Sequence, residues 1–350
     1  MSFYLYAATL LPMPKVLIIR FSSIGDIILT TPVIRAIKQQ VKGVALHYCT
    51  KKSYAGFMQH NPYIDKLYYL EDNLNDLATQ LRAEKYDYII DLHNNLRTLR
   101  LKFMIGAYSW LGEKPEAYSF NKLNIEKWLY VNWKKADAMP PVHIVDRYMD
   151  AAKVLGIVTD NQGLDFFIPE KDKVILSVLP LTHQQSYVAY AIGGQHATKQ
   201  MPLHKIIELC EKINTNIVLL GDKNDAIIGE KVFLHFENLR KNKPNCQTTI
   251  YNACGQYNLN QSASLLQQAH TVFTHDTGLM HIAAALKKNI YSIWGNTTPL
   301  LGMYPYQTNY KVIENNNLSC RPCSKIGFDK CPKGHFKCMN DLRFDELDAF

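Results

Sequence analysis

Thr271-Val272-Phe273-Thr274-His275-Asp276-Thr277-Gly278-Leu279-Met280-His281 is the stretch of sequence that decides the fold of this chain. An apolar, β-branched run meets a short turn containing Asp and Gly, and a helical pattern over Ile282–Leu286 follows. A second junction of this kind, Lys15–Asp26, runs into Ile27–Leu29. Such a turn directs backbone N–H groups and the positive end of a helix at one point, which suits a phosphate. Two such junctions predict two nucleotide-type domains facing each other across a cleft.

The bulk properties of the chain agree with a two-domain protein. It has 350 residues, of which 47% are hydrophobic and 20% are charged, as is typical of a soluble globular protein. The net charge of +8 favours phosphates, nucleic acid or an anionic membrane surface, although an ordinary solvated surface is an equally good interpretation. No apolar run approaches the ~18 residues needed to span a bilayer. We expect a cytoplasmic protein, without nucleic acid as a partner.

The βα alternation along the chain predicts its domain organisation. In the first half we expect strands at 16–21, 44–49, 67–70 and 86–92, and in the second half at 187–192, 216–220, 271–275 and 290–294, with helical patterns between them. This alternation predicts an α/β fold with parallel sheets and helices on both faces. The predicted segments are an N-terminal extension (1–14), a first Rossmann-like domain (15–170), a second one (171–318), and a Cys-rich tail with a C-terminal helix (319–350).

Two stretches of the first half leave alternatives open. The first helix begins either at Ile27 with a kink at Pro32, or at Pro32 with Thr31 as its cap. Residues 105–140 contain three of the four Trp residues and are interpreted as an insertion near the cleft, or as a surface excursion packed on the first domain. Residues 1–14 contain no Lys or Arg and so lack the charged start of a secretory signal, which favours an extension ahead of a domain that begins at Met13.

Four motifs, taken together, resemble one known family. The segment Ile18-Ile19-Arg20-Phe21-Ser22-Ser23-Ile24-Gly25-Asp26 resembles the opening of glycosyltransferase family 9, the ADP-heptose:lipopolysaccharide heptosyltransferase family. Its donor motif is similar to Asp276–His281, its Lys-containing donor loop to Thr198–Pro202, and its late strand end to Trp294–Pro299, although Met201 stands where the family often has Trp. The resemblance implies a GT-B fold, in which two Rossmann-like domains enclose the active site, and transfer of a heptose from ADP-heptose with inversion.

The resemblance implies that Asp26 and Lys199 are catalytic. A single inverting displacement needs a base to take the proton of the acceptor hydroxyl, and an aspartate is ionised at neutral pH. The alternative for Asp26 is an N-cap of a helix that begins at Ile27. Lys199 would neutralise charge on the leaving diphosphate. The alternative for Lys199 is a solvated surface group.

The remaining candidates divide into a donor set and an acceptor set. The donor set comprises Gly193, Gly194, Thr198, Asp222, Asp276, Thr277, Gly278 and His281. Thr277 and Gly278 would offer N–H groups to the pyrophosphate, whereas N-capping by Asp276 and a core position for His281 are the alternatives. The acceptor set comprises Ser23, His93, Asn94 and Arg97, since Arg recognises the phosphorylated sugars that family acceptors carry.

The cofactor prediction rests on two motifs. The chain contains no Asp-x-Asp sequence, which commonly holds a divalent ion on a nucleotide-sugar diphosphate, so we expect no required cofactor. Four cysteines near the C-terminus, Cys320, Cys323, Cys331 and Cys338, allow a structural zinc site or free thiols packed on the second domain.

We therefore expect an inverting glycosyltransferase that moves a heptose or a related sugar to a lipopolysaccharide core or a related glycan acceptor. Its partners would be ADP-heptose or another nucleotide-sugar, a lipid-linked glycan acceptor, and the inner-membrane surface, on which the protein would be peripheral. The alternatives are another GT-B nucleotide-sugar enzyme such as an epimerase, and a non-catalytic nucleotide-sugar-binding protein.

Overall fold

The structure is a computed structural model that describes residues 13–109, 114–243, 245–344 and 347. Most of the predicted N-terminal extension, together with Trp110 and the end of the predicted C-terminal helix, lies outside these residues. The chain divides into two compact units. Unit 1 comprises Met1–Ser22, Pro32–Asn121 and Tyr148–Asp160, and unit 2 comprises Ser23–Thr31, Lys122–Arg147 and Asn161–Phe350.

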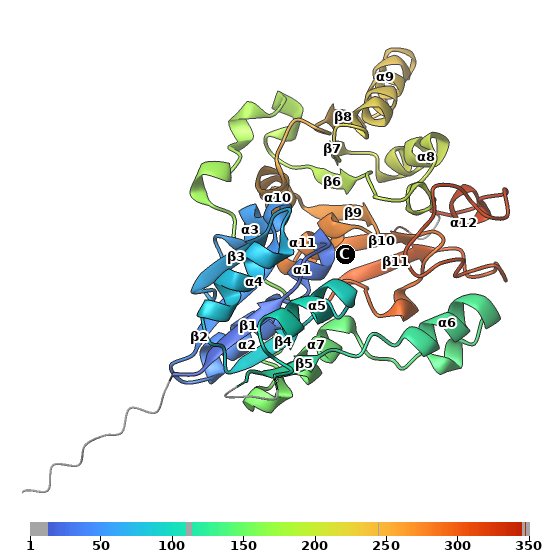
Figure 1. The fold of residues 1–350 in the computed structure, drawn as a ribbon. Coiled ribbons are helices and arrows are strands. Elements are labelled where there is room, and N and C mark those ends of the chain that lie inside the picture. Colours follow the sequence, from blue (N-terminus) through green and yellow to red (C-terminus); the bar gives the residue numbers. More distant parts are fainter. Residues whose placement is uncertain (1–12, 110–113, 244, 345–346, 348–350) are drawn as a thin grey trace, which may run out of the picture. The chain divides into compact units, whose positions relative to one another are not determined.

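Unit 1 is built on a parallel five-stranded sheet with the strand order β3-β2-β1-β4-β5 (Figure 1). Its strands are β1 (Lys15–Ile19), β2 (Ala45–Lys51), β3 (Lys66–Leu70), β4 (Tyr88–Asp91) and β5 (Glu116–Ser119). Its helices are α2 (Thr31–Gln40), α3 (Ala55–Met58), α4 (Leu74–Ala83) and α5 (Leu96–Met104). Residues Val16–Ile19 of the inner strand β1 are fully buried, as the continuous apolar run predicts for a strand covered on both faces.

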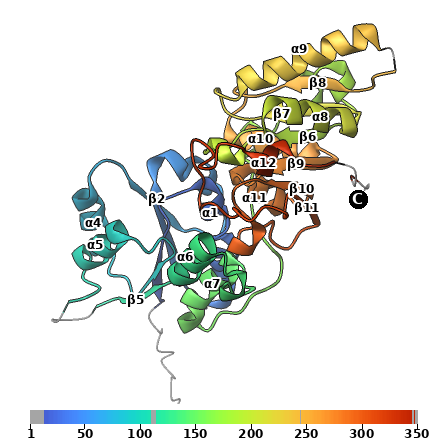
Figure 2. The same cartoon turned by 90° about the vertical axis from the view of Figure 1, so that its right-hand side faces the viewer.

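Unit 2 is built on a parallel six-stranded sheet with the strand order β11-β10-β9-β6-β7-β8. Its strands are β6 (Val188–Ala191), β7 (Asn216–Leu220), β8 (Thr249–Asn252), β9 (Thr271–His275), β10 (Asn289–Trp294) and β11 (Tyr310–Glu314). Its helices are α1 (Ile24–Ile28), α6 (Asn124–Trp133), α8 (Leu203–Ile213), α9 (Ala226–Asn242), α10 (Leu259–Gln268), α11 (Gly278–Ala285) and α12 (Lys337–Asn340), while the residues of α7 (Ile144–Ala152) are shared between the units. Helices α8 and α9 lie side by side next to β7 (Figure 2).

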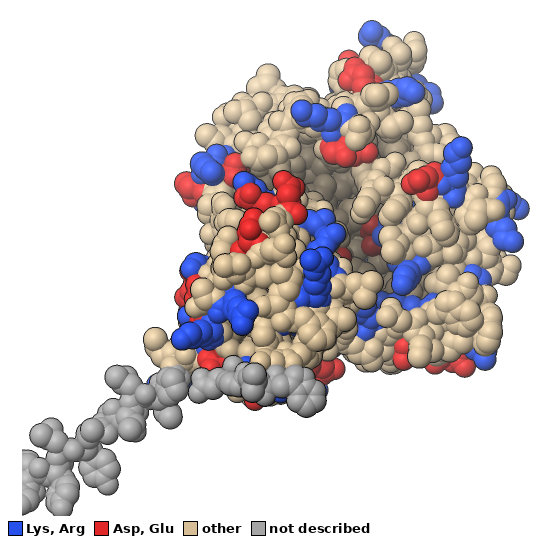
Figure 3. Space-filling model, in the orientation of Figure 1, with Lys and Arg blue, Asp and Glu red and all other residues tan. Residues whose placement is uncertain are grey.

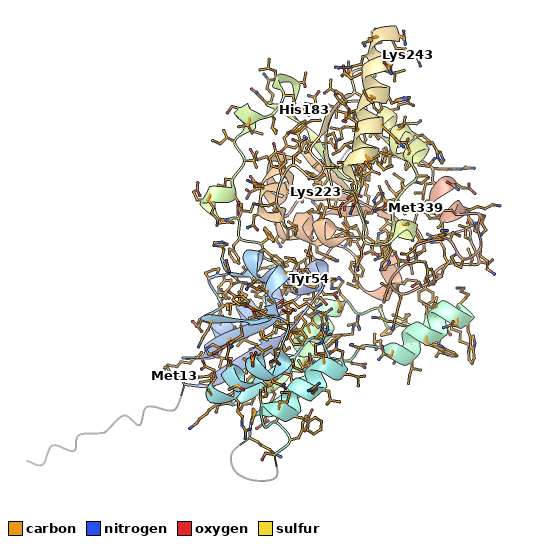
Figure 4. All side chains as sticks on the ribbon, turned by 45° about the horizontal axis from the view of Figure 1, so that its top comes forward. Met13, Tyr54, His183, Lys223, Lys243 and Met339 are labelled. Carbon is orange, nitrogen blue, oxygen red and sulfur yellow. The ribbon has the colours of Figure 1, made fainter. Side chains whose placement is uncertain are left out.

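Short 3₁₀ turns connect these elements at residues 52–54, 136–138, 153–155, 170–172, 176–178, 181–183, 197–199 and 299–301. The first described residue, Met13, contacts the turn at Gly43 in unit 1 and is labelled in Figure 4. No described helix is both long enough and apolar enough to cross a bilayer.

The two parallel sheets confirm the predicted α/β class, and the predicted strands coincide with β1–β4, β6, β7, β9 and β10. The sequence reading missed β5, β8, β11 and the long helix α9. Of the two alternatives for the first helix, the continuous helix from Ile27 is wrong, because the chain forms α1 and then a separate helix, α2. Helix α2 begins at Thr31, one residue before the start that the second alternative gives. Residues 105–140 are not one insertion, since β5 extends the first sheet while α6 belongs to unit 2.

The observed units also differ from the predicted domain boundaries. Residues 23–31 and 122–147, which were predicted in the first domain, are part of unit 2. The physical reason at residues 23–31 is close packing of α1 on α11. A Cβ on Gly25 would lie 2.6 Å from Cδ2 of His281, and a Cβ on Gly278 would lie 2.9 Å from Cγ2 of Ile24. Glycine at both positions therefore lets α1 and α11 approach each other, which explains why α1 is part of unit 2.

Candidate active site

The topology of unit 2 gathers the ends of four strands at one edge of its sheet. Strands β10, β9, β6 and β7 are neighbours in that order, and their registers pair Ile293 with His275 and Ala191 with Leu220. Because parallel strands share a carboxyl edge, the loops after these strands emerge together. Those loops carry most of the predicted donor residues, which explains why positions far apart in the sequence converge.

The Asp276 carboxylate is the centre of this edge. Its Oδ2 atom lies 2.6 Å from Nζ of Lys199 and accepts a hydrogen bond of 2.9 Å from Oγ1 of Thr297. Both members of the ion pair are largely buried, with side-chain exposures of 16% for Lys199 and 11% for Asp276. The structure thus brings together two predicted site residues. It adds Thr297, which lies in the motif Trp294–Pro299 but has no role predicted from the sequence.

The N-terminus of α11 follows directly after Asp276. Thr277 is the N-cap residue, with extended backbone, and its side chain does not cap the helix. The first N–H groups of α11 therefore do not donate to the cap side chain and are available to an anion. Asp276 does not occupy the N-cap position, so the capping alternative for this residue is wrong.

Asp26 is the third residue of α1, after the N-cap Ser23. Its Oδ2 accepts hydrogen bonds from Oγ of Ser23 at 2.8 Å and from the Ser23 N–H at 3.2 Å. The alternative in which Asp26 itself caps a helix beginning at Ile27 is therefore wrong. The predicted acceptor residue Ser23 instead orients the Asp26 carboxylate.

His281 is the fourth residue of α11. It faces α1 and is 2% exposed. Burial lowers the pKa of His281 to about 4, against the opposing influence of Asp276 and Asp26. The ring is therefore neutral at pH 7, and its Nδ1 atom has no hydrogen-bond partner among the described residues. The indole nitrogen of Trp294 and both polar side-chain atoms of Asn296 are likewise buried without a described partner. Buried polar atoms of this kind are typical of a site that a polar ligand or water completes.

The glycine loop after β6 and the loop after β7 meet at Asp225. A Cβ on Gly193 would lie 2.2 Å from Oδ2 of Asp225, so any side chain at this position would have to displace this carboxylate. The same Oδ2 accepts the Asp222 N–H at 2.8 Å, and burial raises the pKa of Asp225. The predicted donor residue Asp222 is exposed, and its carboxylate accepts the N–H of Asn224 within its own turn. Of these two carboxylates, Asp225 rather than Asp222 lies against the glycine loop after β6. Its position four residues after Gly221 is the feature of the sequence that could have identified it.

Gly194, Thr198 and His275 complete the donor-side loops. The Gly194 carbonyl accepts a hydrogen bond from the Gln200 side chain at 2.7 Å, and Thr198 is 2% exposed. His275 joins two of the loops, since it contacts the Gly193 carbonyl through Nδ1 at 3.3 Å and accepts the Met201 N–H through Nε2 at 3.2 Å. Burial lowers the pKa of His275 to about 4, which keeps Nε2 an acceptor at neutral pH.

Lys127 of α6 is a basic group near Asp26 that the sequence reading missed. Burial, followed by the nearby Arg147, lowers the pKa of Lys127 to about 8, while Asp26 acts in the opposite direction. Lys325 and Lys122 add further positive charge to the same surroundings. Nothing in the local sequence marks Lys127, because only the packing of α6 in unit 2 brings it to Asp26.

The predicted acceptor residues His93, Asn94 and Arg97 lie in unit 1, at the end of β4 and the start of α5. The buried Asp91 carboxylate accepts the N–H groups of His93 and Asn94 at 3.0 and 2.7 Å and lies 3.0 Å from Nζ of Lys102. Asn94 adopts a left-handed backbone with φ of 48°. The turn is thus fixed by Asp91, while Arg97 is exposed on α5.

The four tail cysteines are free thiols in the structure. Cys320 and Cys331 lie within electrostatic reach of both Cys323 and Cys338, but no group of three or more Cys, His, Asp or Glu in the described part of the chain is arranged to hold a metal ion. Cys338 is packed in the hydrophobic core of unit 2, as the free-thiol alternative expects. A structural zinc site stays a prediction, which metal analysis of the purified protein would test.

Solved structures with this architecture are GT-B glycosyltransferases. The glycosyl transferase family 9 protein of Veillonella parvula aligns with a TM-score of 0.70 and 22% identity over 86% of each chain. The E. coli heptosyltransferase WaaC with ADP aligns with a TM-score of 0.62 and 19% identity, over 87% of this chain and 95% of that one. Their similarity to this chain establishes the fold.

The sequence comparisons identify the family. The model of glycosyltransferase family 9 (heptosyltransferase) matches residues 74–331, and the chain belongs to this family. The lipopolysaccharide heptosyltransferase 1 of Campylobacter coli is 24% identical over 324 residues, which cover 86% of this chain and 89% of that protein. The protein is therefore a glycosyltransferase of the heptosyltransferase type, as the motifs predict.

Proposed function

We propose that this protein transfers a heptose from ADP-heptose to a lipid-linked glycan of the lipopolysaccharide core, with inversion at the anomeric carbon. The observation that carries the proposal is the assembly in unit 2 of the Asp26 carboxylate, the neutral His281 ring, the Lys199–Asp276 pair and the N-terminus of α11. A base, a cation and a set of peptide N–H groups are the parts that a glycosyl diphosphate displacement requires.

The proposed reaction is a single displacement. The acceptor hydroxyl gives its proton to the Asp26 carboxylate as its oxygen forms a bond to the anomeric carbon. The bond from that carbon to the diphosphate breaks, and the diphosphate leaves with the electron pair. Lys199 and the first N–H groups of α11 stabilise its negative charge, and no cofactor takes part.

The arrangement around Asp26 supports its role as the base. Ser23 donates two hydrogen bonds to Oδ2, which orients the carboxylate. The positive charge of Lys127 lies within electrostatic reach of Asp26, and it would attract an anionic acceptor.

The Asp26→Asn variant tests the proposal most directly. Asn keeps the shape of the side chain but cannot accept the proton, so we expect the transfer rate to fall by about 10²–10⁴. Binding of ADP, measured by isothermal titration, should remain unchanged, because the donor contacts are elsewhere in the site. Asp72→Asn, at an exposed carboxylate of unit 1, serves as the control and should transfer normally.

Two outcomes would contradict this assignment. Full transfer activity in Asp26→Asn would remove Asp26 as the base. Turnover of a nucleotide-sugar without any acceptor, at a rate comparable with transfer, would favour an epimerase.

We further propose that unit 1 meets an anionic lipid surface through the outer face of α5. Leu96, Leu99 and Phe103 follow a helical spacing, are 85%, 40% and 60% exposed, and form one apolar stripe. The exposed Arg97 and Arg100 flank it, and basic side chains lie over this region in Figure 3. Apolar side chains beside arginines match the interface of an anionic bilayer, where a lipid-linked acceptor would be found.

Vesicle binding tests this surface. The wild-type protein should bind phosphatidylcholine vesicles only when phosphatidylglycerol is added, and less in high salt. Changing Leu96, Leu99 and Phe103 to Ser together should weaken binding at least about tenfold, which is about 1.4 kcal/mol. As the control, Ile175, Val178 and Leu181 are 70%, 63% and 85% exposed in unit 2, and their triple Ser variant should bind vesicles normally.

Activity assays separate this surface from the catalytic assignment. The α5 variant should lose transfer to an acceptor embedded in vesicles but keep transfer to a deacylated, water-soluble acceptor. Equal vesicle binding by the wild type and the α5 variant would contradict the docking face and leave the proposed reaction intact.

A further inference from the structure

The cysteine-bearing tail makes its contacts in unit 2. Met339, Leu342 and Phe344 are at most 3% exposed and belong to the hydrophobic core of this unit, and Met339 is labelled in Figure 4. Nζ of Lys205 on α8 donates to the Leu342 carbonyl at 2.6 Å and lies 4.6 Å from the centre of the Phe344 ring. Residues 339–344 of the tail are thus anchored, and residues 318–336 make contacts with the donor-side loops.

The first of these loops, residues 195–200, is held by hydrogen bonds to the backbone of Phe328. The backbone N–H of Phe328 donates to Oγ1 of Thr198 at 2.8 Å, and the Phe328 carbonyl accepts both Oγ1 and the N–H of Thr198, at 2.9 and 3.1 Å. The Thr198 hydroxyl, which the sequence reading assigned to the donor, is therefore engaged by the tail. Lys199, the next residue, carries the cation that pairs with Asp276.

The second loop is held by Arg321, whose side chain is 5% exposed. Its guanidinium donates to the Gly295 carbonyl at 2.6 Å and to the Thr297 carbonyl at 2.8 Å, and it pairs with Glu314 at 2.7 Å. The Cys323 N–H adds a hydrogen bond of 3.0 Å to the Asn296 carbonyl. A planar fork that spans several carbonyls fixes the backbone in a way that the single ammonium of a lysine cannot.

The two loops that the tail holds each supply one partner to the same carboxylate. Lys199 from the first loop and Thr297 from the second both contact Oδ2 of Asp276. The loops also touch each other, since a Cβ on Gly295 would lie 2.7 Å from the Thr198 carbonyl oxygen. Any displacement of the tail would therefore move the cation and the hydroxyl that hold Asp276.

We propose that the tail is a positioning element of the donor site, with Arg321 and the Phe328 backbone as the groups that hold Lys199 and Thr297 in place. The inference rests on the proposed function for the name of the site and adds what positions it. It assigns the tail a role that needs neither a metal ion nor oxidation of its cysteines.

Gly327 offers a sharp test, because it packs against the first loop. A Cβ there would lie 2.6 Å from Cβ of His196, and the residue has φ of +140°. Gly334 has φ of +71° and nothing within 4 Å of an added Cβ, so Gly334→Ala carries backbone strain in the same tail without a clash. Gly327→Ala should push the tail from the loop, and Gly334→Ala should not.

The first measurement is amide hydrogen exchange of the protein without ligand. Exchange over residues 195–200 and 295–298 should be faster in Gly327→Ala than in both the wild type and Gly334→Ala. Thr198→Val, which removes the clasping hydroxyl, should behave like Gly327→Ala, and Thr198→Ser should restore slow exchange. This readout does not depend on the identity of the donor.

The second measurement separates positioning from general loss of structure. In Gly327→Ala and Arg321→Lys, kcat/KM for the nucleotide-sugar should fall by about 10-fold to 10²-fold, as misplacement by about 1 Å predicts, while KM for the acceptor is unchanged. If ADP fails to bind the wild type, the proposed donor is wrong, but the exchange comparison still decides the role of the tail. Equal exchange and equal donor kinetics in Gly327→Ala and Gly334→Ala would overturn the proposal.

Discussion

The Asp276 carboxylate shows how much of the site depends on single contacts. Local sequence placed it at the end of a strand, but its two partners come from loops 77 and 21 residues away. A carboxylate that is 11% exposed is stable as an anion only with such partners, because desolvation disfavours the charge. The ion pair with Asp276 therefore holds the Lys199 ammonium group at the carboxyl edge of the unit 2 sheet.

Replacing Lys199 tests the role of this positioned positive charge. In Lys199→Met the leaving diphosphate would lose its cation, and we expect kcat/KM to fall by about 10²–10³, in line with the removal of one charge-stabilising donor. Lys199→Arg should recover part of the activity, and Lys173→Met, at a lysine that is 52% exposed and paired with Glu170, should have no effect. Steady-state kinetics at a saturating concentration of acceptor would measure kcat/KM for each variant. Activity of Lys199→Met within threefold of the wild type would exclude the role.

At the scale of elements, the pairing of α1 with α11 is the decisive contact. Each helix follows a strand-turn junction that the sequence marks clearly, yet neither junction indicates that the two helices touch. Gly25 and Gly278 allow the contact, and it brings Asp26 and His281 into electrostatic reach of each other. The unit boundary therefore falls inside the predicted first domain.

The Gly25→Ala variant probes this contact. Its added Cβ would lie 2.6 Å from the buried His281 ring, so we expect a loss of about 1–3 kcal/mol in unfolding free energy from overpacking, together with a lower transfer rate. Gly56→Ala in α3 is the matched control, because nothing lies within 4 Å of its added Cβ. It should leave stability unchanged or raise it slightly. Chemical denaturation of the two variants makes the comparison, and equal stability would refute the packing argument.

At the scale of the molecule, buried histidines predict a dependence of stability on pH. Burial lowers the pKa of His143 to about 3, and those of His275 and His281 to about 4. In the unfolded chain each would take a proton near pH 6.5, so the unfolded state binds more protons between about pH 6.5 and 4. Stability is therefore complete above pH 6.5 and decreases as the pH falls through this window.

Urea denaturation at pH 7 and pH 5 should show this loss. Each histidine contributes up to about 2 kcal/mol between these pH values, from about 1.4 kcal/mol per pH unit below 6.5. The His275→Gln variant should show a smaller pH dependence by about one proton. A free energy of unfolding that is equal at pH 7 and pH 5 would show that these side chains are not buried as neutral rings.

The sequence by itself determined the class of each segment near the site. Apolar runs that end in Gly and Asp turns predicted β1, β6, β7, β9 and β10, because the signal for a buried strand and for the turn after it is local. The ordered motifs predicted the family, which the match over residues 74–331 confirms. Asp26, Lys199, Asp276 and His281 were all named from these local patterns.

Only the tertiary structure decided which of these residues have partners, and which they are. It engaged Thr198 with Phe328, placed Asp225 rather than Asp222 against the glycine loop, and brought Lys127 to a position that no local pattern marks. The physical reason is that a strand end fixes where a side chain emerges, whereas its surroundings are set by strand order and helix packing. The contacts of Thr198 with Phe328 and of Gly193 with Asp225 join residues 130 and 32 positions apart, and no local periodicity records them.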